Sequence, residues 1–142
     1  MDIRTVLGGK GREVVSVDSG QAVRDAVALF AERRIGAVPV IDDGAVVGIF
    51  SERDVVYGLA REGAALLDRA VGEVMTAPAL TVGEGEAVIG ALSLMTRRRI
   101  RHLPVVDGDR VIGFVSIGDL VKHRIERIES EAEAMRSYIQ SA

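Results

Sequence analysis

Two short stretches of the chain combine a serine and an aspartate at a spacing that can do chemistry. GIFSERD (48–54) and GFVSIGD (113–119) each end an apolar run with Gly, two apolar residues, Ser, two variable residues and Asp. The carboxylates of Asp54 and Asp119 can accept hydrogen bonds from the two hydroxyls of a ribose. The start of a helix after a strand also offers free backbone amides, which attract phosphate. Both stretches are therefore candidate sites for a phosphorylated nucleoside.

The same spacing also fits a purely structural role. Ser-x-x-Asp directly before an apolar helix is close to a capping box, with Ser51 as the N-cap and Asp54 three residues later. The hydroxyl would satisfy a free amide, and the carboxylate would suit the positive end of the helix. A cap would tolerate Glu at Asp54 or Asp119 whereas a ribose site should not, so the aspartates are the diagnostic residues. Capping and ligand binding compete only in part, and both interpretations stay open.

The two stretches belong to a longer internal repeat. A shift of 65 residues lays Ser16–Val56 over Thr81–Val121 without a gap. RRIGAVPV (33–40) then falls on RRIRHLPV (98–105), and further identical residues recur along both copies. The chain is therefore a tandem duplication of one supersecondary unit.

Each repeat is predicted to be a β-α-β-β-α unit. In the first copy, 14–17 is typical of a short strand, and apolar residues recur at helical spacing over 23–30. Two apolar runs, 37–41 and 46–50, flank the turn sequence DDGA and predict a hairpin. Residues 52–61 again favour a helix. A lead-in with the same apolar spacing precedes each unit: Ile3, Val6 and Leu7 in the first, Val71, Val74 and Met75 in the second.

The duplication, the Pro-Val-x-Asp strand ends and the two Ser-x-x-Asp stretches resemble a pair of CBS (cystathionine β-synthase) domains, the tandem called a Bateman module. Residues 101–122 are similar to small stand-alone bacterial members. The resemblance implies an α/β (α+β) fold of two repeats packed as a pseudo-twofold pair, with a C-terminal helix. We expect repeat 1 with its lead-in over 1–65, repeat 2 over 66–125 and a helical extension over 126–142.

The resemblance also implies clefts that bind AMP, ATP, NAD(H) or S-adenosylmethionine, with the Asp on ribose and the Ser on phosphate. Lys10 could reach a phosphate, although a solvated basic loop explains it equally well. Arg101 and His102 should give the second cleft more grip on phosphate than the small residues at the matching positions of the first. The expected first site comprises Val17, Gly36, Ala37, Val38, Pro39, Ser51, Arg53, Asp54 and Lys10. The expected second site comprises Thr81, Val82, Arg101, His102, Leu103, Pro104, Ser116, Ile117, Gly118 and Asp119.

Composition argues against several other classes of protein. The 142 residues can bury a core, and a net charge of −3 gives no reason to expect nucleic acid as the main partner. Without cysteine there is no disulfide framework and no thiolate metal site. His102 has no second ligand at metal spacing, and no nucleophile–base pair marks an enzyme. No apolar run approaches the ~20 residues that span a bilayer, so we expect a cytoplasmic protein without a membrane partner.

The C-terminal residues carry a heptad pattern. From Val121 the apolar residues step by 4, 3, 4, 3 and 4 to Ile139. Such a helix could lie on its own module or meet a second copy, which would make the protein a homodimer. We predict a non-enzymatic regulator that senses an adenine nucleotide and signals to a protein partner that the chain does not identify. The alternative is a dimeric interaction or scaffold module that binds no nucleotide tightly.

Overall fold

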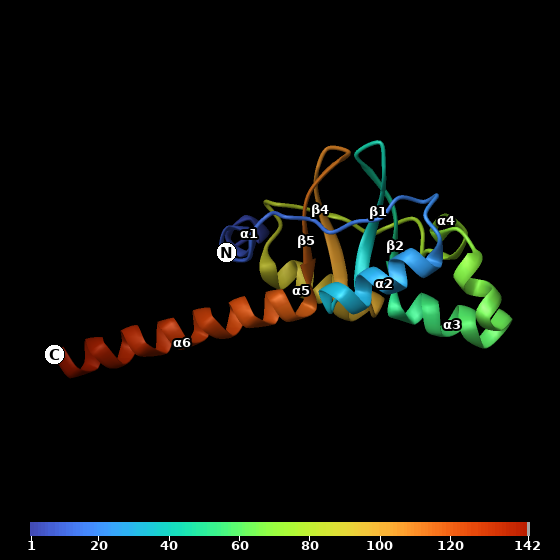
Figure 1. Ribbon diagram of the computed structural model, residues 1–142. Coiled ribbons are helices and arrows are strands. Elements are labelled where there is room, and N and C mark those ends of the chain that lie inside the picture. Colours follow the sequence, from blue (N-terminus) through green and yellow to red (C-terminus); the bar gives the residue numbers. More distant parts are fainter. Residues whose placement is uncertain (142) are drawn as a thin grey trace.

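The computed structural model describes residues 1–141, in which both repeats share one five-stranded sheet (Figure 1). The strands lie in the order β1-β2-β5-β4-β3. Each repeat contributes one hairpin, and the hairpins meet where β2 and β5 pair antiparallel at Ala45 and Arg110. This junction relates the two repeats by an approximate twofold axis. The predicted α+β pair of repeats with a C-terminal helix is confirmed.

The helices and hairpin strands follow the predicted order in each repeat. The first repeat contains α2 (Val23–Arg33), β1 (Ala37–Asp42), β2 (Ala45–Ser51) and α3 (Glu52–Glu62). The second contains β3 (Val82–Gly83), α5 (Val88–Arg98), β4 (His102–Asp107), β5 (Arg110–Ser116) and α6 (Ile117–Ser141). The lead-ins form α1 (Ile3–Lys10) before the first repeat, and η1 (Gly63–Asp68) and α4 (Val71–Val74) before the second.

The first strand of each unit is shorter than predicted. In 14–17 only Val17 makes a bridge, parallel to β1, and β3 has two residues. A tight turn follows at once in the first copy, because the Asp18 carboxylate accepts from the amide of Gly20 at 2.9 Å. The chain therefore leaves the sheet edge early and enters α2.

The interior consists of two cores, and the lead-in of one repeat packs into the core of the other. α1 contributes Ile3, Val6 and Leu7 to the core of the second repeat. Leu66 of η1 and Val71 of α4 join the core of the first repeat. The predicted division of the repeats between residues 65 and 66 does not follow this packing. Apolar spacing along the chain predicts a helix but does not reveal which core the helix joins.

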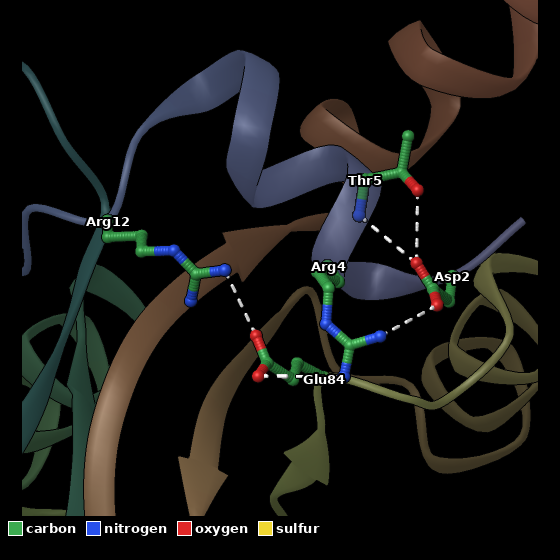
Figure 2. Close-up of polar contacts among 5 residues, drawn as sticks. All are labelled: Asp2, Arg4, Thr5, Arg12 and Glu84. Carbon is green, nitrogen blue, oxygen red and sulfur yellow. Dashed lines mark hydrogen bonds and ion pairs between the residues drawn. The ribbon is translucent and has the colours of Figure 1, made fainter.

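Polar contacts fix α1 on the second repeat (Figure 2). Asp2 caps the helix, since its Oδ1 accepts from Thr5 N at 3.1 Å and from Thr5 Oγ1 at 3.0 Å. The backbone and side-chain hydrogen bonds from Thr5 lower the pKa of the Asp2 carboxyl. Glu84, from the second repeat, accepts from Arg12 Nη2 at 3.0 Å and lies 3.6 Å from Arg4 Nη2. Arg12 thus pairs with a carboxylate outside both motifs.

Two equivalent glycines allow the lead-ins to approach the sheet closely. A Cβ on Gly48 would lie 2.6 Å from Met75 Sδ and 2.9 Å from the carbonyl oxygen of Thr76. A Cβ on Gly113 would lie 2.8 Å from Leu7 Cδ2. The Thr76 backbone is held in place by two hydrogen bonds of 2.9 Å to β2. The motif glycines therefore serve the packing between repeats.

α6 is one helix of 25 residues that extends away from the rest of the molecule (Figure 1). It begins at Ile117 and not at 126, because it is the motif helix of the second repeat. Leu120 is buried, whereas the apolar residues of the heptad pattern beyond it are exposed. The arrangement in which this helix lies on its own module is therefore not the one observed. None of the helices described within 1–141 has the length and apolar character needed to cross a bilayer, and the cytoplasmic location stays a prediction.

Gly48→Ala should destabilise the protein by about 1–3 kcal/mol, since the methyl group would overlap a hydrogen-bonded backbone carbonyl. Urea unfolding measures the change in free energy. Gly83→Ala is the matched control, because no atom lies within 4 Å of its added Cβ, and it should stay within about 0.5 kcal/mol. Equal losses in the two variants would contradict the packing role of Gly48.

Candidate functional site

Two cavities lie between the repeats, one beside each Ser-x-x-Asp motif. Their volumes are about 390 and 380 Å³, within the range of small-molecule sites. The first cavity is lined by Gly36, Ile49, Ser51, Glu52, Arg53, Asp54, Thr76, Pro78, Ala79, Leu80, Arg99, Ile100, Arg101 and His102. The second cavity is lined by Lys10, Glu13, Val15, Arg34, Ile35, Gly36, Ala37, His102, Phe114, Ser116 and Asp119.

Both motifs form the reciprocal hydrogen bonds of a capping box. Asp54 N donates to Ser51 Oγ at 3.4 Å, and Ser51 N donates to Asp54 Oδ2 at 3.0 Å. The same bonds between Asp119 and Ser116 measure 3.0 and 2.8 Å. The capping interpretation therefore holds, and it fixes each carboxylate at a helix N-terminus on a cavity wall.

The two aspartates differ in a further partner, which the opposite lead-in supplies. Thr76 Oγ1 donates to Asp54 Oδ1 at 3.0 Å, whereas Lys10 Nζ lies 2.6 Å from Asp119 Oδ2. α1 has 8 residues and α4 has 4, and Lys10 stands at the end of the longer helix. The first carboxylate thus meets a hydroxyl group, and the second meets a cation.

The charge on Asp119 is maintained by its partners. Burial alone would raise the pKa of its carboxyl, but the hydrogen bond from Lys10 and the Ser116 amide outweigh this effect. The net result is a pKa below the ordinary 3.8. Asp119 is therefore a carboxylate at neutral pH, ready to accept hydrogen bonds.

The residues at the starts of β1 and β4 line the cavities in a different combination from the one predicted. Arg101 lines the first cavity and Ala37 the second, which reverses the predicted assignment of both. Gly36 and His102 line both cavities. These residues lie at the open ends of the two hairpins, and each cavity draws on both hairpins. Spacing within one repeat does not reveal this arrangement.

Lys10 is also placed differently from the prediction. It lies beside Asp119 in the second cavity and not in the first, because α1 packs on the second repeat. Ser51, Arg53 and Asp54 line the first cavity as expected, and Ser116 and Asp119 line the second. The remaining predicted residues lie outside both linings: Val17, Val38, Pro39, Thr81, Val82, Leu103, Pro104, Ile117 and Gly118. Six of them are buried: Val17, Val38, Pro39, Val82, Leu103 and Pro104.

Sequence reasoning missed the contribution of Thr76 and of two arginines. Arg34 and Arg99 end α2 and α5 in the left-handed conformation, with φ of 54° and 55°, and each lines a cavity. Their repetition at equivalent positions of the two copies was the visible signal. Thr76 carried no such signal, since it matches no threonine in the first lead-in.

The two cavities differ in charge. The first carries three guanidinium groups and two carboxylates, from Arg53, Arg99, Arg101, Glu52 and Asp54. The second carries two cationic groups and two carboxylates, from Lys10, Arg34, Glu13 and Asp119. The first cavity therefore has the stronger attraction for an anionic ligand. In the described residues, 1–141, no cluster of three or more His, Asp or Glu side chains could hold a metal ion.

His102 stands between the two cavities and stacks on Phe114, with ring centroids 5.5 Å apart and an interplanar angle of 12°. Burial lowers the pKa of its imidazole below the ordinary 6.5. Asp119 opposes this shift, while Lys10 and Arg101 add to it. The ring is therefore uncharged at neutral pH.

The low pKa of His102 predicts a loss of stability in weak acid. Below its ordinary value of 6.5 the unfolded chain binds a proton more readily than the folded one, so stability falls as the pH falls. His102→Phe and His102→Asn should both flatten the dependence of melting temperature on pH between about 7 and 5. Calorimetry at several pH values measures this slope. A slope in both variants equal to that of the unsubstituted chain would contradict the assignment.

Comparisons with known proteins agree with the geometry. The CBS domain family matches residues 11–61 and 71–126. The chain is 36% identical to CBS domain-containing protein CBSX3, mitochondrial, of Arabidopsis thaliana, over 97% of this chain and 71% of that protein. A crystal structure of a CBS-domain containing protein from Agrobacterium tumefaciens is 39% identical, with a TM-score of 0.83 over 87% of this chain and 92% of that one.

The crystal structure of CBSX2 in complex with AMP is also similar. It has a TM-score of 0.72 at 29% identity, over 82% of this chain and 90% of that one. The resemblance drawn from the motifs is thereby confirmed, and the chain belongs to the CBS domain family, with two CBS domains in tandem.

Proposed function

We propose that the chain is a non-catalytic regulatory module that binds adenine nucleotides in its two cavities and passes its ligand state to a protein partner. The observation that carries this proposal is the placement of a motif carboxylate, Asp54 or Asp119, on the wall of each cavity beside cationic side chains. The AMP complex of the related CBSX2 supports an adenine nucleotide as the ligand class.

In the first cavity the ribose would lie on Asp54. This carboxylate accepts from Ser51 and Thr76, and its about four acceptor positions leave room for a ribose hydroxyl. Arg99 and Arg101 on the same cavity would bind the phosphate, because a guanidinium group can hold two phosphate oxygens at once. Apolar lining residues are available for the base: Ile49, Pro78, Leu80 and Ile100.

In the second cavity a ribose has to compete with Lys10 for Asp119. The pair is short at 2.6 Å, but its side chains are 33% and 29% exposed, so solvent weakens it. Once displaced, the Lys10 ammonium would be free to pair with a phosphate group. Ligand binding would thus act on α1, whose neighbour Met1 contacts His123 of α6. This contact offers a route from the second cavity to the protruding helix.

The alternative function is a scaffold module without tight nucleotide binding. The observation that favours it is that each carboxylate already has partners, in the capping boxes and in the Lys10–Asp119 pair. The two functions differ in whether an adenine nucleotide stabilises the fold.

AMP, ATP or NADH should raise the melting temperature, because a ligand at 100 times its dissociation constant adds about 2.7 kcal/mol. The double substitution Asp54→Asn with Asp119→Asn should abolish most of this shift, since each lost charge-assisted hydrogen bond is worth about 1.5–3 kcal/mol. Thermal unfolding with each nucleotide measures the effect. Asp109→Asn, an exposed turn residue outside both cavities, is the control. An unchanged melting temperature at millimolar nucleotide would contradict nucleotide binding and would favour the scaffold function.

The two cavities should bind AMP with different affinities, the first more tightly. This order is opposite to the prediction from the sequence, because Arg101 lines the first cavity. Calorimetric titration should show that Arg101→Ala weakens the tighter site about tenfold or more. Lys10→Met should instead improve binding of uncharged adenosine to the second cavity. Arg98→Ala is the control, as an exposed arginine outside both linings. Two equal sites, or unchanged AMP binding in Arg101→Ala, would refute this assignment.

A further inference from the structure

The protruding part of α6 carries an apolar stripe. The seam consists of six residues spaced by 4, 3, 4, 3 and 4: Val121, Ile125, Ile128, Ala132, Met135 and Ile139. All six are exposed, and the five larger side chains keep between 41% and 65% of their surface in contact with solvent. In a single chain this apolar stripe remains in contact with water, and that exposure is unfavourable in free energy.

The seam faces away from the module to which the helix is attached. If Ile125 and Ile128 are taken as heptad positions a and d, Leu120 falls at position c and His123 at position f. Leu120 is fully buried in the second core, and His123 contacts Met1 beside α1. These positions lie on the opposite side of a helix from a and d. A second helix can therefore approach the seam from Val121 onward without meeting the module that anchors α6.

The charged residues beside the seam distinguish between the two orientations of a partner helix. Position g holds Arg124 and Glu131, and position e holds Glu129 and Arg136. In a parallel pair each g residue faces the e residue five positions later on the other helix. Arg124 then meets Glu129 of the second copy, and Glu131 meets Arg136. Both contacts join opposite charges, and the twofold symmetry provides each of them twice.

An antiparallel pair that aligns all six seam residues joins like charges instead. Glu129 would face Glu129 of the second copy, Glu131 would face Glu131, and Lys122 would face Arg136. Such contacts disfavour the antiparallel arrangement. Glu131 and Arg136 also pair within their own helix, with Arg127 and Glu133. Those pairs are exposed and weak, so they leave both side chains able to contact a partner helix.

We propose that α6 pairs with α6 of a second copy of this chain as a parallel, in-register coiled coil through residues 121–139. The seam is short for an autonomous coiled coil. However, α6 is continuous with a helix anchored by Leu120, so the cost of starting the helix is already met within the module. The arrangement brings both modules to the same end of the coiled coil. It does not depend on whether the cavities bind a nucleotide.

Sedimentation of the full chain tests the charge pattern. Arg124→Glu and Glu129→Arg should each raise the dissociation constant of the dimer about tenfold, because each creates two like-charge contacts. An equal mixture of the two variants should recover the original affinity, since the mixed dimer restores opposite charges at every contact. Glu126→Arg makes the same charge change as Glu129→Arg at the exposed position b, outside the seam, and should leave the affinity unchanged. Loss of affinity in all three variants alike, or no recovery in the mixture, would overturn the proposal.

Single cysteines test the orientation, because the chain contains none of its own. Ala132→Cys should form a disulfide between two copies under mild oxidation, since position 132 faces itself only in the parallel register. An antiparallel pair would instead link Ala132→Cys to Ile128→Cys in a mixture, and that result would overturn the proposal. A chain ending at His123 should dimerise more weakly than the full chain, because it lacks most of the seam. A full chain that stays monomeric, or a truncated chain that dimerises equally well, would also overturn it.

Discussion

The structure depends on the close approach of each lead-in to the sheet of the opposite repeat. At Gly48 and Gly113 a single added carbon would overlap Met75 and Leu7, so the backbone can come this near only where a side chain is missing. The approach buries the apolar residues of the lead-ins in the two cores. It also brings the polar ends of the lead-ins to the motif aspartates. The composition of both cavities follows from this one packing constraint.

The first motif glycine is therefore connected to Asp54 of the candidate site through a chain of contacts. The missing side chain at Gly48 lets Met75 and the backbone of Thr76 pack against β2. Thr76 is thereby held where its hydroxyl donates to Asp54. The lead-in helix that packs on the second repeat is α1, which is longer than α4. It supplies the ammonium group of Lys10 in place of a hydroxyl group. A few additional residues in a lead-in helix thus change the electrostatic character of one cavity, while the Ser and Asp of the repeated motif stay the same. Duplicated sites can diverge through their neighbours as well as through their own residues.

Much of this fold could be predicted from the sequence because its determinants are local. The hairpin over 37–50 and the capping role of Ser51 depend on residues a few positions apart, and periodicity and turn chemistry report them directly. The positions of Lys10 and Arg101 depend on how two repeats pack, and contacts between residues over a hundred positions apart leave no local pattern. The Lys10–Asp119 pair spans 109 residues. The duplication indicated the two motifs beside which the cavities lie, but not which repeat supplies each wall.

The exchange of the lead-ins also imposes an order of assembly during synthesis. The first core draws its residues from Val15 to Met75, a continuous segment that is complete well before the second repeat has been translated. The second core joins Ile3, Val6 and Leu7 to residues as distant as Leu120. α1 thus leaves the ribosome before all the helices that will cover it, and its apolar face has no partner until nearly the whole second repeat has emerged. The segment that is made early is among the last to be buried, and in that interval it is accessible to chaperones and to other nascent chains.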